Sequence, residues 1–387
     1  MKIGVLVIGI CLLVATACAA DAPDAYTQTQ PDQTIAQSTT TSMAVTASET
    51  EDPSFESEDS EASESASTTS PASEREEPST DKAIAPYRGT PVDPSTQFAP
   101  RLALKIDNAP AALPQEGLQE ADIVFEELVE GGLTRFLAVF HSQVPEFVGP
   151  IRSGRSSDIP LLMPFDGALF GWSGSNWAFR RLLDTVAIKD VGLYENPANY
   201  WRNNDRPSPS NLWARSTQLL EQFEGEVFPF EQLWPFQDST DSNARAGKKV
   251  GGVQINWGST DVSFHWVDEQ KTWKRVQNGK QHLALTATGD EVEVTAENVV
   301  VQFTKYLLTN EIDGNGARIP LAQLSEGSGA AWILKNGEIT EGRWIKPNIT
   351  VHTQFVDETG KSIPMTPGAT WILLAPRDTA TIIDIDD

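Results

Sequence analysis

The composition of the chain changes sharply near residue 83, and this change limits what can fold. Residues 19–82 hold 23 Ser or Thr, 15 acidic and two basic residues, no Gly, and only two aromatics, Tyr26 and Phe55. Such a segment cannot bury enough apolar surface to offset its chain entropy. We therefore predict a disordered, acidic tether over residues 18–84, with a cation-binding or partner-binding tail as the alternative interpretation.

The first 20 residues have the pattern of a lipoprotein signal peptide. Lys2 precedes an apolar run from Ile3 to Ala15, and small residues stand just before Cys18. The other cysteine, Cys11, lies inside the run, so a cleaved chain keeps no thiol for a disulfide. We expect residues 1–17 to be removed and Cys18 to be lipidated, which anchors the chain to the outer face of the cytoplasmic membrane. An uncleaved membrane helix is the alternative, and it also leaves the remainder outside.

Charge and motif content argue against several function classes. The net charge is −25 and no basic stretch is present, so we expect no nucleic-acid partner. No Gly-rich phosphate loop with a Lys is found, which argues against a nucleotide enzyme. The four histidines are far apart and have no mature thiol to support them, so we predict no metal site and no cofactor.

Periodicity in the rest of the chain predicts an α+β fold. We expect a mixed α/β first domain over residues 85–240 and a β-rich second domain over residues 250–378, with the boundary in the polar stretch 238–252. Asn278-Gly279 and Asn336-Gly337 are hairpin signals between apolar runs. In the first domain we predict strands at 101–107, with one buried face, 123–125 and 133–140, and helices at 158–163, 176–186 and 217–223.

Several motifs together carry a family resemblance. In the first half they are Asp107-Asn108, Pro114-Gln115, Ala121–Glu126, Glu130–Phe136 and Gly149–Arg155, and in the second half Asn298–Gln302, Gly327–Gly329 and Pro367–Trp371. The chain strongly resembles the YerB-like bacterial lipoproteins from about residue 86 to residue 376. The resemblance implies a two-part α+β fold of unknown biochemical function. One departure is Ser210, where such proteins usually have His, so a mechanism through that imidazole does not transfer.

Arginines and carboxylates are concentrated in one short segment. Arg135, Arg152 and Arg155 lie among four carboxylates within 34 positions, namely Asp122, Glu126, Glu127 and Glu130. Guanidinium forks suit a bidentate contact to a carboxylate or phosphate, and a helix start after Gly154 would add backbone N–H groups to an anion site. The alternative is that these side chains form internal ion pairs. Sequence spacing leaves both interpretations open.

Paired carboxylates and aromatic residues support a second hypothesis. Asp122, Glu126, Glu127 and Glu130 could supply the acid and base of a glycosidase, and sugar rings stack on aromatic faces such as Trp172 and Trp177. Most large aromatics are nevertheless core residues.

We therefore favour a lipid-anchored, non-catalytic envelope protein that binds an anionic or glycan ligand. The expected ligand-binding residues are Arg135, Arg152, Arg155, Trp172, Trp177 and Asn211. The alternatives are a cell-envelope glycan or phosphodiester hydrolase using the four carboxylates, and a purely structural scaffold.

Overall fold

The computed structural model describes residues 82–385, except 230–231, 238–246 and 315. The expected signal peptide, Cys18 and nearly all of the expected tether lie outside the described residues, as does much of the expected boundary stretch. The described residues belong to one compact unit. Its described part consists mostly of strands, with three short α-helices. The expected mixed α/β character of the first domain is therefore not confirmed.

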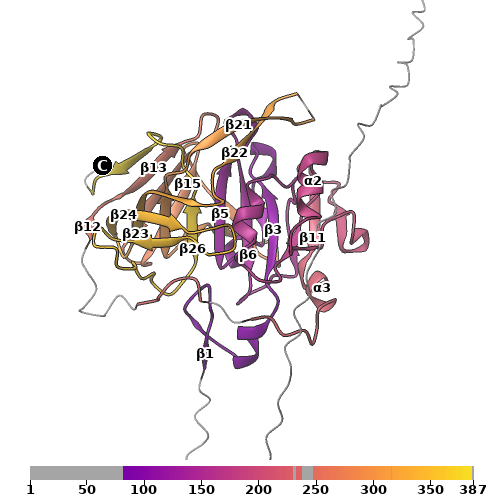
Figure 1. Ribbon diagram of the computed structural model, residues 1–387, viewed down its shortest axis with the longest axis horizontal. Coiled ribbons are helices and arrows are strands. Elements are labelled where there is room, and N and C mark those ends of the chain that lie inside the picture. The colour runs from indigo at the N-terminus through magenta and orange to yellow at the C-terminus, as the bar shows by residue number, and fades with distance from the viewer. Residues whose placement is uncertain (1–81, 230–231, 238–246, 315, 386–387) are drawn as a thin grey trace, which may run out of the picture. The chain divides into compact units, whose positions relative to one another are not determined.

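One large mixed sheet forms the centre of this unit (Figure 1). Its order is β12-β24-β23-β20-β26-β5-β6-β3-β8-β9, with β25 paired to β24. The strands β26 and β5 pair in parallel, so segments from both halves of the chain share the sheet. The bounds are β12 (Lys248–Lys249), β24 (Glu338–Lys346), β23 (Gly327–Lys335), β20 (Asn298–Gln302), β26 (Thr370–Leu373), β5 (Ile123–Leu128), β6 (Thr134–Phe140), β3 (Leu102–Asp107), β8 (Leu169–Gly171), β9 (Lys189–Asp190) and β25 (Gln354–Val356).

Smaller sheets complete the unit. A second sheet has the order β16-β15-β14-β13-β27, with β19 paired to β15, and the others are β10-β11-β7, β18-β17-β4, β21-β22 and β1-β2. Their bounds are β16 (Lys280–Gln281), β15 (Thr272–Gln277), β14 (Asp261–Val267), β13 (Gly252–Asn256), β27 (Ala380–Ile383), β19 (Thr295–Ala296), β10 (Tyr200–Arg202), β11 (Leu212–Arg215), β7 (Phe147–Val148), β18 (Glu291–Glu293), β17 (Leu283–Leu285), β4 (Gln115–Glu116), β21 (Tyr306–Ile312), β22 (Arg318–Ala322), β1 (Ala83–Ile84) and β2 (Pro91–Val92).

Apolar side chains fill both faces of the central sheet. Leu102, Leu104 and Ile106 of β3 belong to a core that includes residues of the second sheet. Ala103 belongs to a second core, which contains residues of the helices. The expectation of one buried face for residues 101–107 was therefore wrong, because every residue of β3 is buried. The two charged residues of this strand, Lys105 and Asp107, form ion pairs with Asp158 and Arg152.

The three expected helices are present with shorter bounds. They are α1 (Asp158–Leu162), α2 (Trp177–Leu183) and α3 (Ser216–Glu221). The Asn176 side chain caps α2 by accepting a hydrogen bond from the Phe179 N–H at 2.8 Å. Both hairpin signals are confirmed, with Asn278 and Asn336 at φ of 50° and 52°. Over the described part of the chain, no helix has the length and apolar character needed to span a bilayer.

Candidate functional site

The three arginines predicted as anion contacts come together at one end of the central sheet. Arg135, in β6, lies opposite Asp107 of β3 in the strand register. Arg152 follows a residue that bridges to β3, and its own N–H donates to the Lys105 carbonyl at 2.7 Å. Arg155 stands three residues before α1. We call Arg135, Arg152 and Arg155 the arginine cluster.

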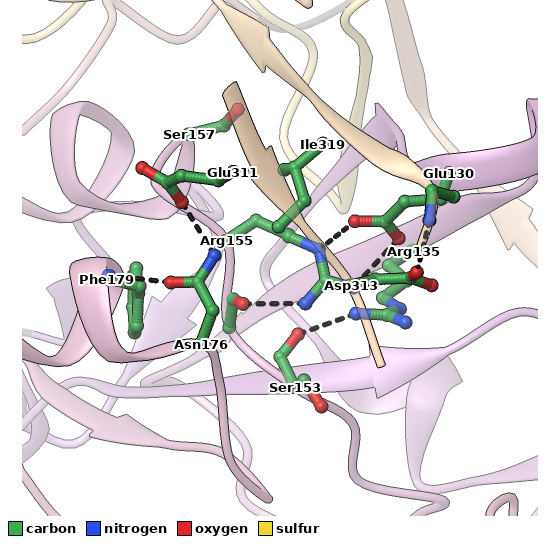
Figure 2. Close-up of polar contacts among 12 residues, drawn as sticks. Glu130, Arg135, Ser153, Arg155, Ser157, Asn176, Phe179, Glu311, Asp313 and Ile319 are labelled. Carbon is green, nitrogen blue, oxygen red and sulfur yellow. Dashed lines mark hydrogen bonds and ion pairs between the residues drawn. The ribbon is translucent and has the colours of Figure 1, made fainter. Parts of the chain in front are cut away.

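All three guanidinium nitrogens of Arg155 donate hydrogen bonds to protein atoms. Its Nε and Nη2 donate to the two carboxylate oxygens of Glu130 at 2.7 and 2.8 Å, and its Nη1 donates to the Gly154 carbonyl at 2.9 Å. Burial acts to raise the pKa of Glu130, but the hydrogen bonds and charge of Arg155 outweigh it and lower that pKa. This bidentate pair, seen in Figure 2, is the internal ion pair that the sequence left open as an alternative.

Arg135 is a buried cation that forms no ion pair with any described residue. The residue is 7% exposed, and its hydrogen bond is from Nη1 to the Ser153 carbonyl at 2.9 Å (Figure 2). Within the described ranges, no carboxylate oxygen lies within 4 Å of its guanidinium nitrogens. Burial, with the charges of Arg155 and Arg152, lowers the pKa of Arg135 to about 10. The carboxylates of Asp107 and Glu130 oppose this shift without forming an ion pair with the guanidinium. A buried charge that is only partly compensated is costly.

The unbonded nitrogens of Arg135 are not sealed inside the protein. Nε and Nη2 of Arg135 donate to no described residue, yet neither is among the buried nitrogens that lack a partner. Solvent therefore reaches this side of the guanidinium.

Arg152 forms the more open side of the cluster. Its side chain is 25% exposed, and its Nε lies 3.2 Å from Oδ2 of the buried Asp107. The Ser210 hydroxyl also donates to Asp107 Oδ2, at 2.7 Å. Ser210 stands where the YerB-like proteins usually have His, and its hydroxyl binds the Asp107 carboxylate. The Nη1 and Nη2 groups of Arg152 remain available to solvent or a ligand.

A hairpin from the second half of the chain lies against the cluster's neighbours. Glu311 in β21 accepts a hydrogen bond from the Asn176 side chain at 2.6 Å. The Ala322 N–H of β22 donates to the Ser157 hydroxyl at 3.0 Å. Figure 2 shows Glu311, Asp313 and Ile319 of this region in the same view as Arg135 and Arg155. These two contacts near the cluster therefore join residues that are 135 and 165 positions apart.

The expected helix-start contribution to an anion site is not available. Asp158, the first residue of α1, accepts a hydrogen bond from the Arg155 N–H at 2.7 Å. Its other oxygen accepts from Lys105 Nζ, which also donates to Glu127. These three side chains are at most 1% exposed. A carboxylate of the protein already neutralises this helix start.

The other carboxylates proposed for hydrolysis are also buried and engaged. Glu126 accepts from Arg275 at 2.8 Å, from Thr134 at 2.8 Å and from the Trp371 ring N–H at 3.1 Å. Asp122 accepts from the backbone N–H groups of His141 and Ser142 at 2.7 and 2.8 Å. Burial raises the pKa values of Asp122 and Glu127. None of these groups is placed to reach a substrate in solution.

Sequence reasoning missed the partner of Glu126. Arg275 is fully buried in β15, and its Nη1 lies 2.6 Å from Nδ1 of His282. Burial, followed by the charge of Arg275, lowers the pKa of His282 well below its usual value. A signal was present, because Arg275 alternates with Trp273 and Gln277 on the buried face of the strand.

The predicted aromatic platforms differ in exposure. Trp172 is 1% exposed, packs against Phe170 and Phe179, and donates its ring N–H to Asp190 at 2.8 Å. Its assignment as a stacking face does not agree with this burial. Trp177 is 72% exposed, with the Arg181 guanidinium 4.5 Å from its ring centre.

The remaining predicted contact, Asn211, is nearly buried. Its Oδ1 accepts a hydrogen bond from Arg202 at 2.7 Å, while its Nδ2 group donates to no described residue. Over the described ranges, no group of three His, Cys, Asp or Glu residues is arranged to hold a metal ion.

Comparisons with known proteins agree with this architecture. Residues 89–229 match the N-terminal domain, and residues 253–372 the C-terminal domain, of the protein of unknown function DUF3048. The chain is 28% identical over 308 residues to YerB of Bacillus subtilis (strain 168), which is named as a candidate lipoprotein. That match covers 78% of this chain and 89% of YerB.

A solved structure shares the fold. The crystal structure of the YerB protein from Bacillus subtilis superposes with a TM-score of 0.65 at 27% identity, covering 78% of this chain and 99% of that one. The two domain matches together span well over half of the residues. The chain therefore belongs to the YerB-like family of two-part proteins of unknown function.

Proposed function

We propose that this protein is a lipid-anchored, extracytoplasmic envelope lipoprotein that binds an anionic ligand through Arg135 and Arg152. The observation that carries the proposal is the buried guanidinium of Arg135, which has no counter-ion within reach in the described part of the chain. Burying such a cation is unfavourable unless something compensates it. An external anion meets that need and reaches the open side of the group.

A binding role fits the geometry better than hydrolysis does. Glu126, Glu127 and Asp122 are held by Arg275, by Lys105 and by backbone N–H groups, all inside the protein. Glu130 is held by both forks of Arg155. A general acid or base must reach the substrate, and these four carboxylates are bound elsewhere. The arginine cluster needs no catalytic partner to hold an anion.

The anchor and tether suit a protein that binds material at the cell surface. YerB of Bacillus subtilis is named as a candidate lipoprotein, and Cys18 follows a signal-like segment in this chain. A 64-residue coil spans about 40 to 50 Å root-mean-square. Lipidation at Cys18 would let the folded unit search that distance from the outer face of the cytoplasmic membrane. An anionic envelope glycan or a small anionic ligand is then within reach.

Retention on isolated cell-wall material tests the proposal. The full chain is purified from bacterial membranes in detergent, with its lipidated N-terminal Cys18 peptide first identified by mass spectrometry. We expect the wild-type protein to co-sediment with the wall, and the Arg135→Gln, Arg152→Gln double variant to lose at least about tenfold in affinity. That loss is about 1.4 kcal/mol.

The matched control carries Arg343→Gln and Arg377→Gln, which together remove two positive charges from exposed positions. This control should bind like wild type. Equal retention of the double variant and the control would contradict the proposal.

A further inference from the structure

The charges around the cluster limit what kind of anion it takes. The arginine cluster brings three positive charges, and two carboxylates of the protein, Asp107 and Glu130, bind directly to two of its members. Among the directly paired groups one positive charge is therefore left over, and Glu311 and Asp313 of the β21–β22 hairpin add negative charge nearby. The remaining positive charge is that of Arg135, because Arg155 is paired with Glu130 and Arg152 is paired with Asp107.

The layer beneath the cluster supplies no second positive charge. Lys105 lies between Glu127 and Asp158, so one cation faces two carboxyl groups. Oε2 of Glu127 is buried and has no hydrogen-bond partner, and burial raises the pKa of this group. With Glu127 protonated the layer is neutral, and with Glu127 ionised it is negative. In either state, a doubly charged ligand keeps at least one charge without a partner.

The site also has few free hydrogen-bond donors. Nε and Nη2 of Arg135 and the two terminal nitrogens of Arg152 are the open N–H groups of the cluster. The Ser153 carbonyl and the carboxylates of Glu130 and Asp107 border them, and these acceptors repel additional negative oxygens. Such a border favours a group with two or three oxygens that share one charge.

Resting on the proposed anion site, we infer that the cluster selects a singly charged oxyanion, such as a carboxylate, a sulfate ester or a phosphodiester, over a doubly charged phosphate monoester. The selection follows from the single unneutralised guanidinium of Arg135 and from the acceptors that border it. Doubly charged phosphate is the commoner expectation for an arginine-rich site, so the inference separates this cluster from a phosphate-monoester pocket.

A pair of small anions tests the inference directly. Methyl sulfate and methyl phosphate share a tetrahedral shape and one methyl group. At pH 7.5 they carry one charge and nearly two, because the second pKa of a phosphate monoester is about 6. The rise in melting temperature of the full chain is measured against anion concentration at constant ionic strength, and the same rise in Arg135→Gln is subtracted. We expect methyl sulfate to bind at least about fivefold more tightly.

The outcomes distinguish the inference from the proposed function. Tighter binding of methyl phosphate, lost in Arg135→Gln, would overturn the inference and leave an anion site in place. Equal shifts in wild type and Arg135→Gln for both anions would overturn the proposed function as well. Should Arg135→Gln not fold, Arg152→Gln replaces it, because that side chain is a quarter exposed and lies on the open side of the site.

Discussion

Arg135 and Arg155 are almost equally buried, at 7% and 6% exposure, yet their electrostatic positions differ. Arg155 is bound by both oxygens of Glu130, so its charge is neutralised in place. Arg135 donates to one carbonyl, beside two like charges. Removing the first leaves Glu130 without its partner, whereas removing the second relieves a repulsion. The same residue type therefore serves the fold at one position and, in our proposal, a ligand at the other.

Stability measurements on two single variants test this difference. Arg155→Gln should lower the free energy of unfolding by about 2 to 4 kcal/mol, because it breaks a largely buried pair and leaves a carboxylate uncompensated. Arg135→Gln should change it by less than about 1 kcal/mol. Urea denaturation of the full chain at pH 7 gives both values.

The pH dependence of the same variants provides a control. Since the pKa of Glu130 is lowered in the folded state, the contribution of the pair is present above the unfolded pKa of about 4.3 and is lost as the pH falls through the folded pKa. The difference in free energy of unfolding between wild type and Arg155→Gln should therefore become smaller at acid pH. Equal destabilisation by the two variants at pH 7 would instead make Arg135 a structural residue.

At the residue scale, the sequence could single out the three arginines but not their convergence or their pairing. The three arginines lie in a short segment, but their convergence depends on the pairing of β6 with β3 and on the bridge from Ile151 to β3, which local spacing does not show. Which one meets Glu130 depends on the bend after β5, where Gly131 and Gly132 take φ of 72° and 74°. The Glu126–Arg275 pair joins residues 149 positions apart, so the alternation that places Arg275 on a buried face does not identify Glu126 as its partner.

Hairpins are the elements that the sequence predicted best. Asn-Gly pairs favour turns with positive φ at both central residues, and both pairs in this chain adopt that geometry. Gly337 joins the nine-residue strands β23 and β24, and a Cβ there would meet Trp266 Nε1 at 2.8 Å. Gly279 has nearly the same φ but no atom within 4 Å of such a Cβ. The two turns thus differ in packing and not in backbone conformation.

Alanine at the two turn glycines separates these effects. Gly279→Ala should cost about 1 kcal/mol of folding stability, through backbone strain alone. Gly337→Ala should cost about 2 to 4 kcal/mol, because the clash with Trp266 adds to the same strain. Thermal or urea unfolding provides the comparison. Equal costs would mean that Trp266 moves aside freely, against the close packing seen at this turn.

Helix ends and strand burial were predicted less accurately. The apolar pattern placed the end of the second helix at Val186, but α2 ends at Leu183. In β3, alternation of apolar and polar residues suggested one exposed face, whereas Lys105 and Asp107 are buried with charged partners. Periodicity records residue polarity and cannot show that a polar side chain has a buried partner.

At the scale of the whole molecule, the central sheet brings distant segments together. Strand β26 lies between β20 and β5 and pairs in parallel with both, so it connects residues near 370 with residues near 300 and near 123. Strand order of this kind depends on long-range packing and was not predicted from local patterns. The family models divide the chain into residues 89–229 and 253–372. The central sheet, which positions Arg135, contains strands from both of these segments.

The assembly explains why an open cation persists in the interior. β6 fixes Arg135 between β5 and β3, and the chain at Ser153 closes one side of its guanidinium. On the other side, Nε and Nη2 of Arg135 donate to no described residue. We regard the external anion as the missing partner of this arrangement.

Locating a bound anion by anomalous diffraction tests this central claim most directly. Crystals of the protein would be soaked in sodium bromide, a singly charged anion with a strong anomalous signal, alongside crystals of Arg135→Gln. We predict a bromide peak in contact with Nε or Nη2 of Arg135 and beside Arg152, absent from the variant. Bromide bound only elsewhere, with a carboxylate of the protein seated on Arg135, would contradict the account.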